Sequence, residues 1–163
     1  MAGRVIWITG LSGAGKTTLA RELIQRLQEC ESQPILLDGD ILRNLLQVSE
    51  NVLDSHSRKA RIKLALKYAQ MCRLLSDQGF IVVIATISMF DELYAWNREN
   101  ITNYFEVYLK VPLDELCRRD PKSIYKRYKN GELINVAGLD MSIDIPKTPH
   151  LILDFETQPS IWQ

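Results

Sequence analysis

Cysteine is scarce in this sequence, and long hydrophobic runs are missing. The three cysteines, Cys30, Cys72 and Cys117, are odd in number and widely spaced, which argues against a disulfide framework and against a zinc site. No apolar stretch approaches the ~20 residues that a membrane-spanning helix needs. We therefore predict a cytoplasmic protein with reduced thiols and no membrane partner.

An excess of charge of either sign is also missing. Lys plus Arg and Asp plus Glu both number 20, so the formal net charge is zero. A neutral chain gives no reason to expect nucleic-acid binding, and any affinity for phosphates has to come from local clusters. The chain has 163 residues, of which 46% are hydrophobic. This size and composition predict a single domain over residues 1–163.

Two kinds of apolar segment alternate along the chain. The segments expected to form strands are 5–9, 35–38, 80–88, 104–111 and 150–154. The segments with helical spacing are 17–30, 41–48, 56–77, 91–100 and a stretch from Leu113 onward. This alternation predicts an α/β fold, a three-layer α/β/α sandwich around a mostly parallel five-stranded sheet. Ligands of such sheets bind at the carboxyl ends of the strands.

A glycine-rich motif follows the first expected strand. The stretch GLSGAGKT, from Gly10 to Thr17, fits the pattern G-x-x-x-x-G-K-[ST]. In this pattern backbone N–H groups wrap a polyphosphate, the lysine reaches its β- and γ-phosphates, and the final hydroxyl binds Mg²⁺. We therefore predict ATP and Mg²⁺ as cofactors. The residues expected to hold them are Gly10, Ser12, Gly13, Ala14, Gly15, Lys16, Thr17 and Thr18.

The second expected strand ends in the sequence Asp38-Gly39-Asp40, which contains two carboxylates. Taken alone, they fit a solvated turn, because Asp and Gly both favour turns. Beside a phosphate-binding loop they fit a second role better. One of the two could help to hold hydrated Mg²⁺, for which we predict Thr17 and Asp38, and the other could accept the proton of an attacking hydroxyl. We predict that Lys16, Asp38 and Asp40 are the catalytic residues.

A basic segment lies near the end of the chain. Residues 118–129 contain six Lys and Arg residues and one acid, Asp120. A solvated helix face explains most of these charges. Arg119 and Lys122 flank Asp120-Pro121 and are the ones expected to reach phosphates, as part of a small lid over about residues 118–131. The absence of the guanine-reading sequence N-K-x-D argues against a GTPase, and the small size favours a small-molecule kinase.

Several motifs occur together in the order and spacing of one known family. They are GLSGAGKTTLA, ILLDGDILR, QGFIVVIATIS, YFEVYLKVPLDEL, RRDPKSIYKR and GE…GLD. In these stretches the chain resembles the adenylyl-sulfate kinases over about residues 5–154. The resemblance implies a P-loop kinase fold. It also implies transfer of the γ-phosphoryl group of MgATP to the 3′-hydroxyl of adenylyl sulfate.

The resemblance also assigns residues to the two ligands. It implies that Arg119 contacts ATP, that Asp40 faces the acceptor hydroxyl, and that Arg43 and Lys122 bind the acceptor. Ile87 and Ser88 fall where the family has its acceptor-contacting I-S-P segment. The resemblance further implies that the chain forms a homodimer.

The acceptor motif departs from the family pattern. Where the family has F-S-x-x-D-R-x-E-N, the corresponding residues here are His56, Ser57, Ala60, Arg61 and Leu64. Ser57 and Arg61 match the family pattern and are expected to contact the acceptor. The family's Phe, Asp and Asn are replaced here by His56, Ala60 and Leu64. Val136 stands where the family tends to have a second aromatic residue, and loss of a stacked base removes about 1–3 kcal/mol of binding.

These departures leave three functions open. We predict an ATP-dependent kinase of a nucleotide-type small molecule, with adenylyl sulfate as the first candidate acceptor. The alternative is the same reaction on a pyrimidine nucleotide, such as the cytidine diphosphoramidate used by one relative of the family. A further alternative is a regulator that binds ATP without catalysis.

Overall fold

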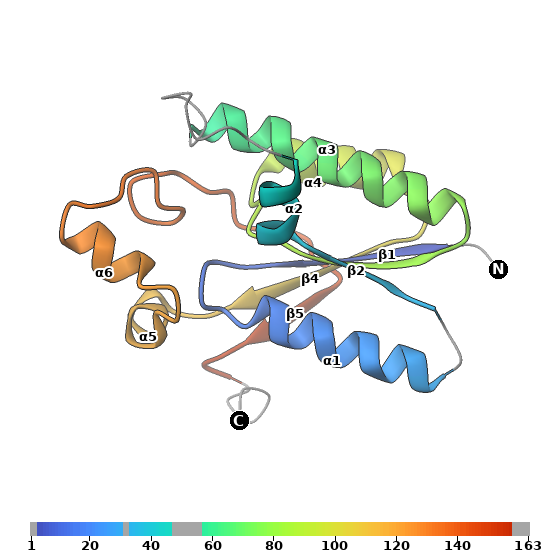
Figure 1. Ribbon diagram of the computed structural model, residues 1–163, viewed down its shortest axis with the longest axis horizontal. Coiled ribbons are helices and arrows are strands. Elements are labelled where there is room, and N and C mark those ends of the chain that lie inside the picture. The colour runs from blue at the N-terminus through green and yellow to red at the C-terminus, as the bar shows by residue number, and fades with distance from the viewer. Residues whose placement is uncertain (1–2, 31–32, 47–56, 158–163) are drawn as a thin grey trace.

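Five parallel strands form the centre of the protein in the computed structural model, which describes residues 3–30, 33–46 and 57–157 (Figure 1). The strands are β1 (Arg4–Thr9), β2 (Ile35–Asp38), β3 (Ile81–Ala85), β4 (Tyr104–Lys110) and β5 (Leu151–Asp154). Their order across the sheet is β2-β3-β1-β4-β5, and every pairing is parallel. The predicted α/β fold is therefore confirmed, with a sheet that is wholly parallel.

Helices cover both faces of the sheet. They are α1 (Lys16–Glu29), α2 (Gly39–Leu45), α3 (Arg58–Asp77), α4 (Asp91–Asn100), α5 (Leu113–Arg119) and α6 (Ile124–Lys129). Figure 1 shows α1 on one face, α3 and α4 on the other, and α5 and α6 at one end of the sheet. Within the described residues, no helix combines the length and apolarity needed to cross a membrane.

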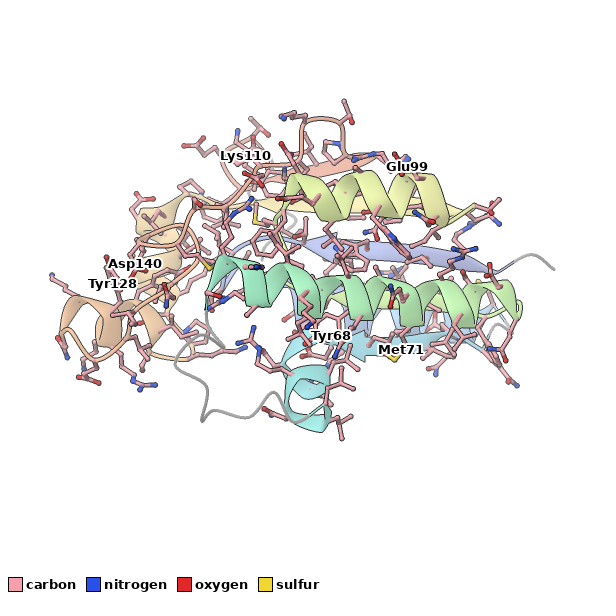
Figure 2. All side chains as sticks on the ribbon, turned by 90° about the horizontal axis from the view of Figure 1, so that it is seen from above. Tyr68, Met71, Glu99, Lys110, Tyr128 and Asp140 are labelled. Carbon is pink, nitrogen blue, oxygen red and sulfur yellow. The ribbon has the colours of Figure 1, made fainter. Side chains whose placement is uncertain are left out.

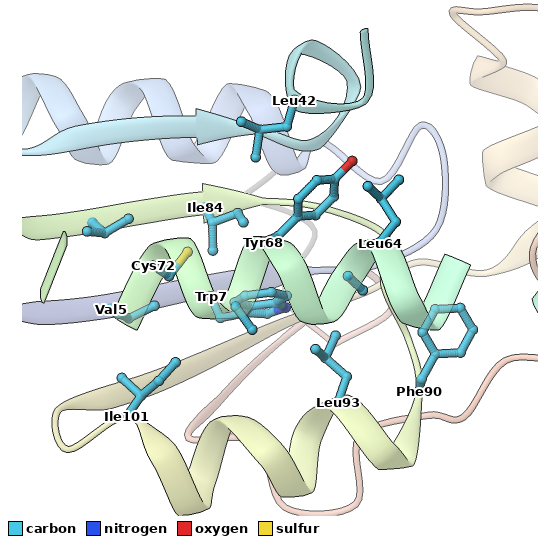
Figure 3. Packing of buried hydrophobic residues seen from close by; sticks show 13 residues of the cluster. Val5, Trp7, Leu42, Leu64, Tyr68, Cys72, Ile84, Phe90, Leu93 and Ile101 are labelled. Atoms are coloured by element: carbon cyan, nitrogen blue, oxygen red, sulfur yellow. The ribbon is translucent and has the colours of Figure 1, made fainter. Parts of the chain in front are cut away.

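The two faces have separate hydrophobic cores. Trp7 and Ile8 are neighbours on β1 and both are fully buried, but they belong to different clusters of buried side chains. This follows from the pleat of a strand, which sends successive side chains to opposite faces. Trp7 lies between α3 and α4 among residues such as Cys72 and Leu93 (Figure 3). These cores hold the carboxyl ends of the strands in fixed positions.

The structure changes some predicted boundaries for clear reasons. The third strand ends at Ala85, before the predicted Ser88, because Ser88 has a φ of 24° that interrupts an extended chain. The basic segment forms two short helices, since Asp120 has a φ of 24° and Pro121 has no N–H to continue a helix. The predicted helix 56–77 begins at Arg58. His56 lies outside the described residues.

Candidate active site

A cleft of about 700 Å³ lies at the carboxyl ends of the strands. It brings together most of the residues that the sequence predicts for the two ligands. Those lining it are Ser12, Gly13, Gly15, Lys16, Thr17, Thr18, Asp38, Asp40, Arg43, Arg61, Ile87, Ser88, Arg119 and Lys122. They come from segments far apart in the sequence, so the parallel topology assembles the site.

The glycine-rich loop connects β1 to α1 at the floor of this cleft. Gly13 and Gly15 have φ angles of 81° and 94°, which side chains rarely tolerate. No side chain caps the N-terminus of α1 within the described structure, and Gly15 occupies the capping position. The first N–H groups of a 14-residue helix are therefore available to a phosphate, together with the positive end of the helix dipole.

Lys16 extends from the first residue of α1 back along the loop. Its Nζ donates a hydrogen bond to the Leu11 carbonyl at 2.8 Å. Burial and the nearby charge of Lys122 lower the pKa of Lys16 to about 8, against the opposing influence of Asp40 and Asp38. The ammonium group therefore lies where a polyphosphate would supply the missing negative charge.

Thr17 and Asp38 meet across the cleft. The Thr17 hydroxyl donates to Asp38 Oδ2 at 2.8 Å, and Asp38 Oδ1 accepts the backbone N–H of Asp40 at 2.9 Å. A hydroxyl and a carboxylate are ligands of the type that Mg²⁺ prefers, and Mg²⁺ takes its remaining ligands from water and phosphate. The described residues contain no cluster of three or more His, Cys, Asp or Glu that would form an all-protein metal site. The pair therefore fits a nucleotide-bound Mg²⁺.

Asp40 is the second carboxylate of the cleft and lies at the start of α2. Its side chain is 67% exposed and forms an ion pair with Lys122, from the segment between α5 and α6. Arg119 lies at the end of α5, where its Nε donates to Glu115 Oε1 at 2.7 Å and its guanidinium lies over the ring of Phe155. The basic segment thus brings two cations to the cleft.

One face of α3 lines the opposite wall. Arg61, Leu64 and Tyr68 are spaced i, i+3, i+7, so they project from the same side of the helix. Arg61 donates to the Asn135 carbonyl at 2.7 Å, and burial together with neighbouring Arg43 lowers its pKa to about 10. The Tyr68 hydroxyl points toward α2 and donates to the Gly39 carbonyl at 3.3 Å (Figures 2 and 3).

Some residues of the cleft were not predicted from the sequence. Tyr68, Phe90, Pro121 and Met141 all line it. The helical spacing from Arg61 is a signal for Tyr68, and the position of Pro121 next to Lys122 is a signal for that proline. Phe90 and Met141 come from loops whose path no local pattern reveals.

Four predicted site residues do not line the cleft. Gly10 and Ala14 are buried within the glycine-rich loop. The Ser57 hydroxyl accepts the N–H of Ala60 at 3.2 Å and caps α3. Val136 is 8% exposed in the core, and its N–H donates to Asp140 Oδ1 at 2.6 Å. Contacts of Ser57 and Val136 with an acceptor remain predictions.

Comparison with known proteins identifies the family. The family model described as adenylylsulphate kinase matches residues 2–154. The chain belongs to the adenylylsulphate kinase family. The match covers the loop, both carboxylates and the basic segment, so the predicted resemblance is confirmed.

Individual members of the family are similar over most of their length. A cytidine diphosphoramidate kinase from Campylobacter jejuni is 40% identical over 91% of this chain and 84% of its own. An adenylyl-sulfate kinase from Pseudomonas aeruginosa is 38% identical over 92% of this chain and 76% of its own. The structure of a Mycobacterium tuberculosis APS kinase in complex with AMPPNP and APS matches with a TM-score of 0.84 at 32% identity, covering 98% of this chain and 96% of that one.

Proposed function

We propose that this protein is an ATP-dependent kinase that transfers the γ-phosphoryl group of MgATP to the 3′-hydroxyl of a nucleotide. The observation that carries this proposal is the contact of Thr17 with Asp38 in a cleft that also holds Lys16 and Asp40. A phosphate loop, a site suited to Mg²⁺ and a carboxylate for the acceptor hydroxyl are the parts that phosphoryl transfer requires. The similarity to a structure solved with AMPPNP and APS supports the same two classes of ligand.

In the proposed reaction, the loop and Lys16 hold the β- and γ-phosphates, while Thr17 and Asp38 hold Mg²⁺. Mg²⁺ held there would neutralise charge on the transferred group. The acceptor oxygen forms a bond to the γ-phosphorus, the bond from that phosphorus to the β–γ bridging oxygen breaks, and ADP leaves. Asp40 takes the proton of the acceptor hydroxyl. Segment 118–131 closes over the phosphates and excludes water.

The proposed acceptor is anionic, because Arg43 and Arg61 line the cleft and lie near each other. Adenylyl sulfate is the first candidate, since the family and its Pseudomonas aeruginosa member carry that name. One observation favours cytidine diphosphoramidate as the second candidate. Val136 is buried away from the cleft, and Leu64 lines it, so two positions of the family's acceptor pattern offer no aromatic ring or amide to adenine.

The test is an ADP-release assay with MgATP and either adenylyl sulfate or cytidine diphosphoramidate. ADP release with one acceptor and none with the other identifies the substrate. Binding of ATP with no ADP release for either acceptor or for related uridine nucleotides would contradict the kinase proposal and favour a regulator.

A further inference from the structure

Tyr125 forms a hydrogen bond between the basic segment and the glycine-rich loop. Its hydroxyl donates to the Ser12 carbonyl at 2.8 Å, although 113 residues separate the two in sequence. Tyr125 is only 4% exposed, and burial raises the pKa of its hydroxyl, which therefore stays protonated and able to donate. The Tyr125 hydroxyl can therefore donate this hydrogen bond throughout the neutral pH range.

Hydrogen bonds to Asp120 and packing in the core fix the position of Tyr125. The Asp120 carboxylate accepts the backbone N–H of Tyr125 at 3.2 Å and that of Lys126 at 2.9 Å. These bonds hold the first turn of α6 against the chain that enters it. The phenol ring packs in the core cluster that includes Leu116 and Val107. The backbone and the ring of Tyr125 are therefore both held in place where its hydroxyl contacts Ser12.

The Ser12 carbonyl belongs to the same peptide unit as the Gly13 N–H. A trans peptide is planar, so its C=O and its N–H point in opposite directions, and the described chain has no cis peptide. A donor that fixes the carbonyl on one side consequently fixes the N–H on the other. Ser12 and Gly13 both line the cleft. The hydrogen bond from Tyr125 thus turns the Gly13 N–H away from α6 and toward the nucleotide side.

The basic segment also covers Gly13 directly. A methyl group built on Gly13 would lie 3.5 Å from Cδ of Pro121 in this segment and 3.8 Å from Cδ2 of Leu116 in the preceding part of α5. The same segment carries Lys122 to Asp40. The loop that binds phosphate and the segment that closes over it therefore meet at the peptide that Tyr125 holds.

We propose that Tyr125 is a positioning residue for ATP, whose hydroxyl aims the Gly13 N–H at the polyphosphate through the Ser12 carbonyl. This inference rests on the proposed function, because it assumes that the loop holds ATP. The nucleotide and Tyr125 do not touch; the residue acts through the orientation of one peptide group.

The test compares Tyr125→Phe with Tyr128→Phe. Phe keeps the packed ring and removes only the hydroxyl. Tyr128 lies on the same helix, and its hydroxyl makes no hydrogen bond within the described part of the chain, which makes it a matched control. Binding of MgATP and of magnesium tripolyphosphate is measured by calorimetry. We expect Y125F to bind both about three- to tenfold more weakly, Y128F to bind as wild type, and the acceptor's KM to be unchanged.

The outcomes separate the two proposals. Wild-type affinity of Y125F for MgATP would overturn the role of Tyr125 and leave the kinase proposal intact. Failure of the wild-type protein to bind MgATP would overturn the proposed function. If Y125F does not fold, amide NMR of the wild-type protein decides. The Gly13 N–H should shift strongly when MgATP is added, and an unchanged Gly13 signal would contradict the inference.

Discussion

Asp40 is the residue on which the proposed chemistry depends most. Its carboxylate is exposed in the cleft and forms an ion pair with Lys122. We predict that Asp40→Asn lowers kcat about 10²- to 10⁴-fold, because the amide cannot accept a proton. Its Kd for MgATP should stay near that of wild type. Steady-state kinetics and calorimetry check both values, and a kcat within a factor of a few of wild type would remove Asp40 from the mechanism.

Lys16 gives a prediction about pH as well as binding. Its pKa is lowered from 10.5 to about 8, so between these values the unfolded chain binds the proton more tightly than the ligand-free folded protein. The contribution of Lys16 to the free energy of unfolding therefore rises as the pH rises from about 8 to 10.5. Lys16→Met should lack this rise and lose ATP affinity about 10- to 100-fold.

Urea unfolding at pH 7.5 and at pH 9.5 measures the Lys16 effect as a difference between the two proteins. Other titrating groups are common to both and cancel. A pH dependence that is the same in wild type and K16M would show that Lys16 is not the responsible group.

Arg43 tests the assignment of the acceptor half. It lines the cleft near Arg61, whose pKa its charge helps to lower. Arg43→Ala should raise the acceptor's KM about 10- to 100-fold, because a charged hydrogen bond is lost, and change the KM of ATP little. Initial rates with each substrate varied in turn measure the two constants. A larger effect on ATP would mean that the two halves of the cleft are assigned the wrong way round.

At the start of α2, the side chain of Asp38 both caps the helix and contributes to the active site. Asp38 Oδ1 caps α2, while Oδ2 accepts the Thr17 hydroxyl. Asp38→Asn keeps a capping oxygen but loses the charge that Mg²⁺ needs, so turnover should fall about 10²-fold or more with little loss of stability.

Asp38→Ala is the control, since it should show the same loss of turnover and unfold about 1 kcal/mol more easily. Thermal unfolding and turnover at varied Mg²⁺ measure the two effects. Equal stability of the Asn and Ala variants would contradict the capping role.

The elements themselves were largely predictable from the sequence. Helical periodicity identifies α1 and α4, because each helix buries one face, and apolar runs identify the central strands, because both of their faces are buried. The division of the basic segment at Asp120-Pro121 and the capping of α3 by Ser57 were not predicted. Both depend on backbone angles and on hydrogen bonds that one residue's identity does not reveal.

At the scale of the whole molecule, the topology explains why the site could be predicted in part. Parallel strands place their carboxyl ends together, so the loop after β1, the carboxylates after β2 and Ser88 after β3 had to meet. Tyr68 joins them through the helical spacing that it shares with Arg61, whereas Met141 joins them through a long connection that leaves no local signal. The single domain over residues 1–163, the cytoplasmic location and the homodimer remain predictions.

MgATP and a nucleotide acceptor are proposed to bind in the same cleft and to react there. The most direct test of this proposal is mass spectrometry of the acceptor after incubation with the protein, ATP and Mg²⁺, with D40N as the matched control. We expect adenylyl sulfate or cytidine diphosphoramidate to gain one phosphoryl group at its 3′-hydroxyl with the wild-type protein, and almost no phosphorylated acceptor with D40N. An unmodified acceptor with wild-type protein that demonstrably binds ATP would contradict the proposal.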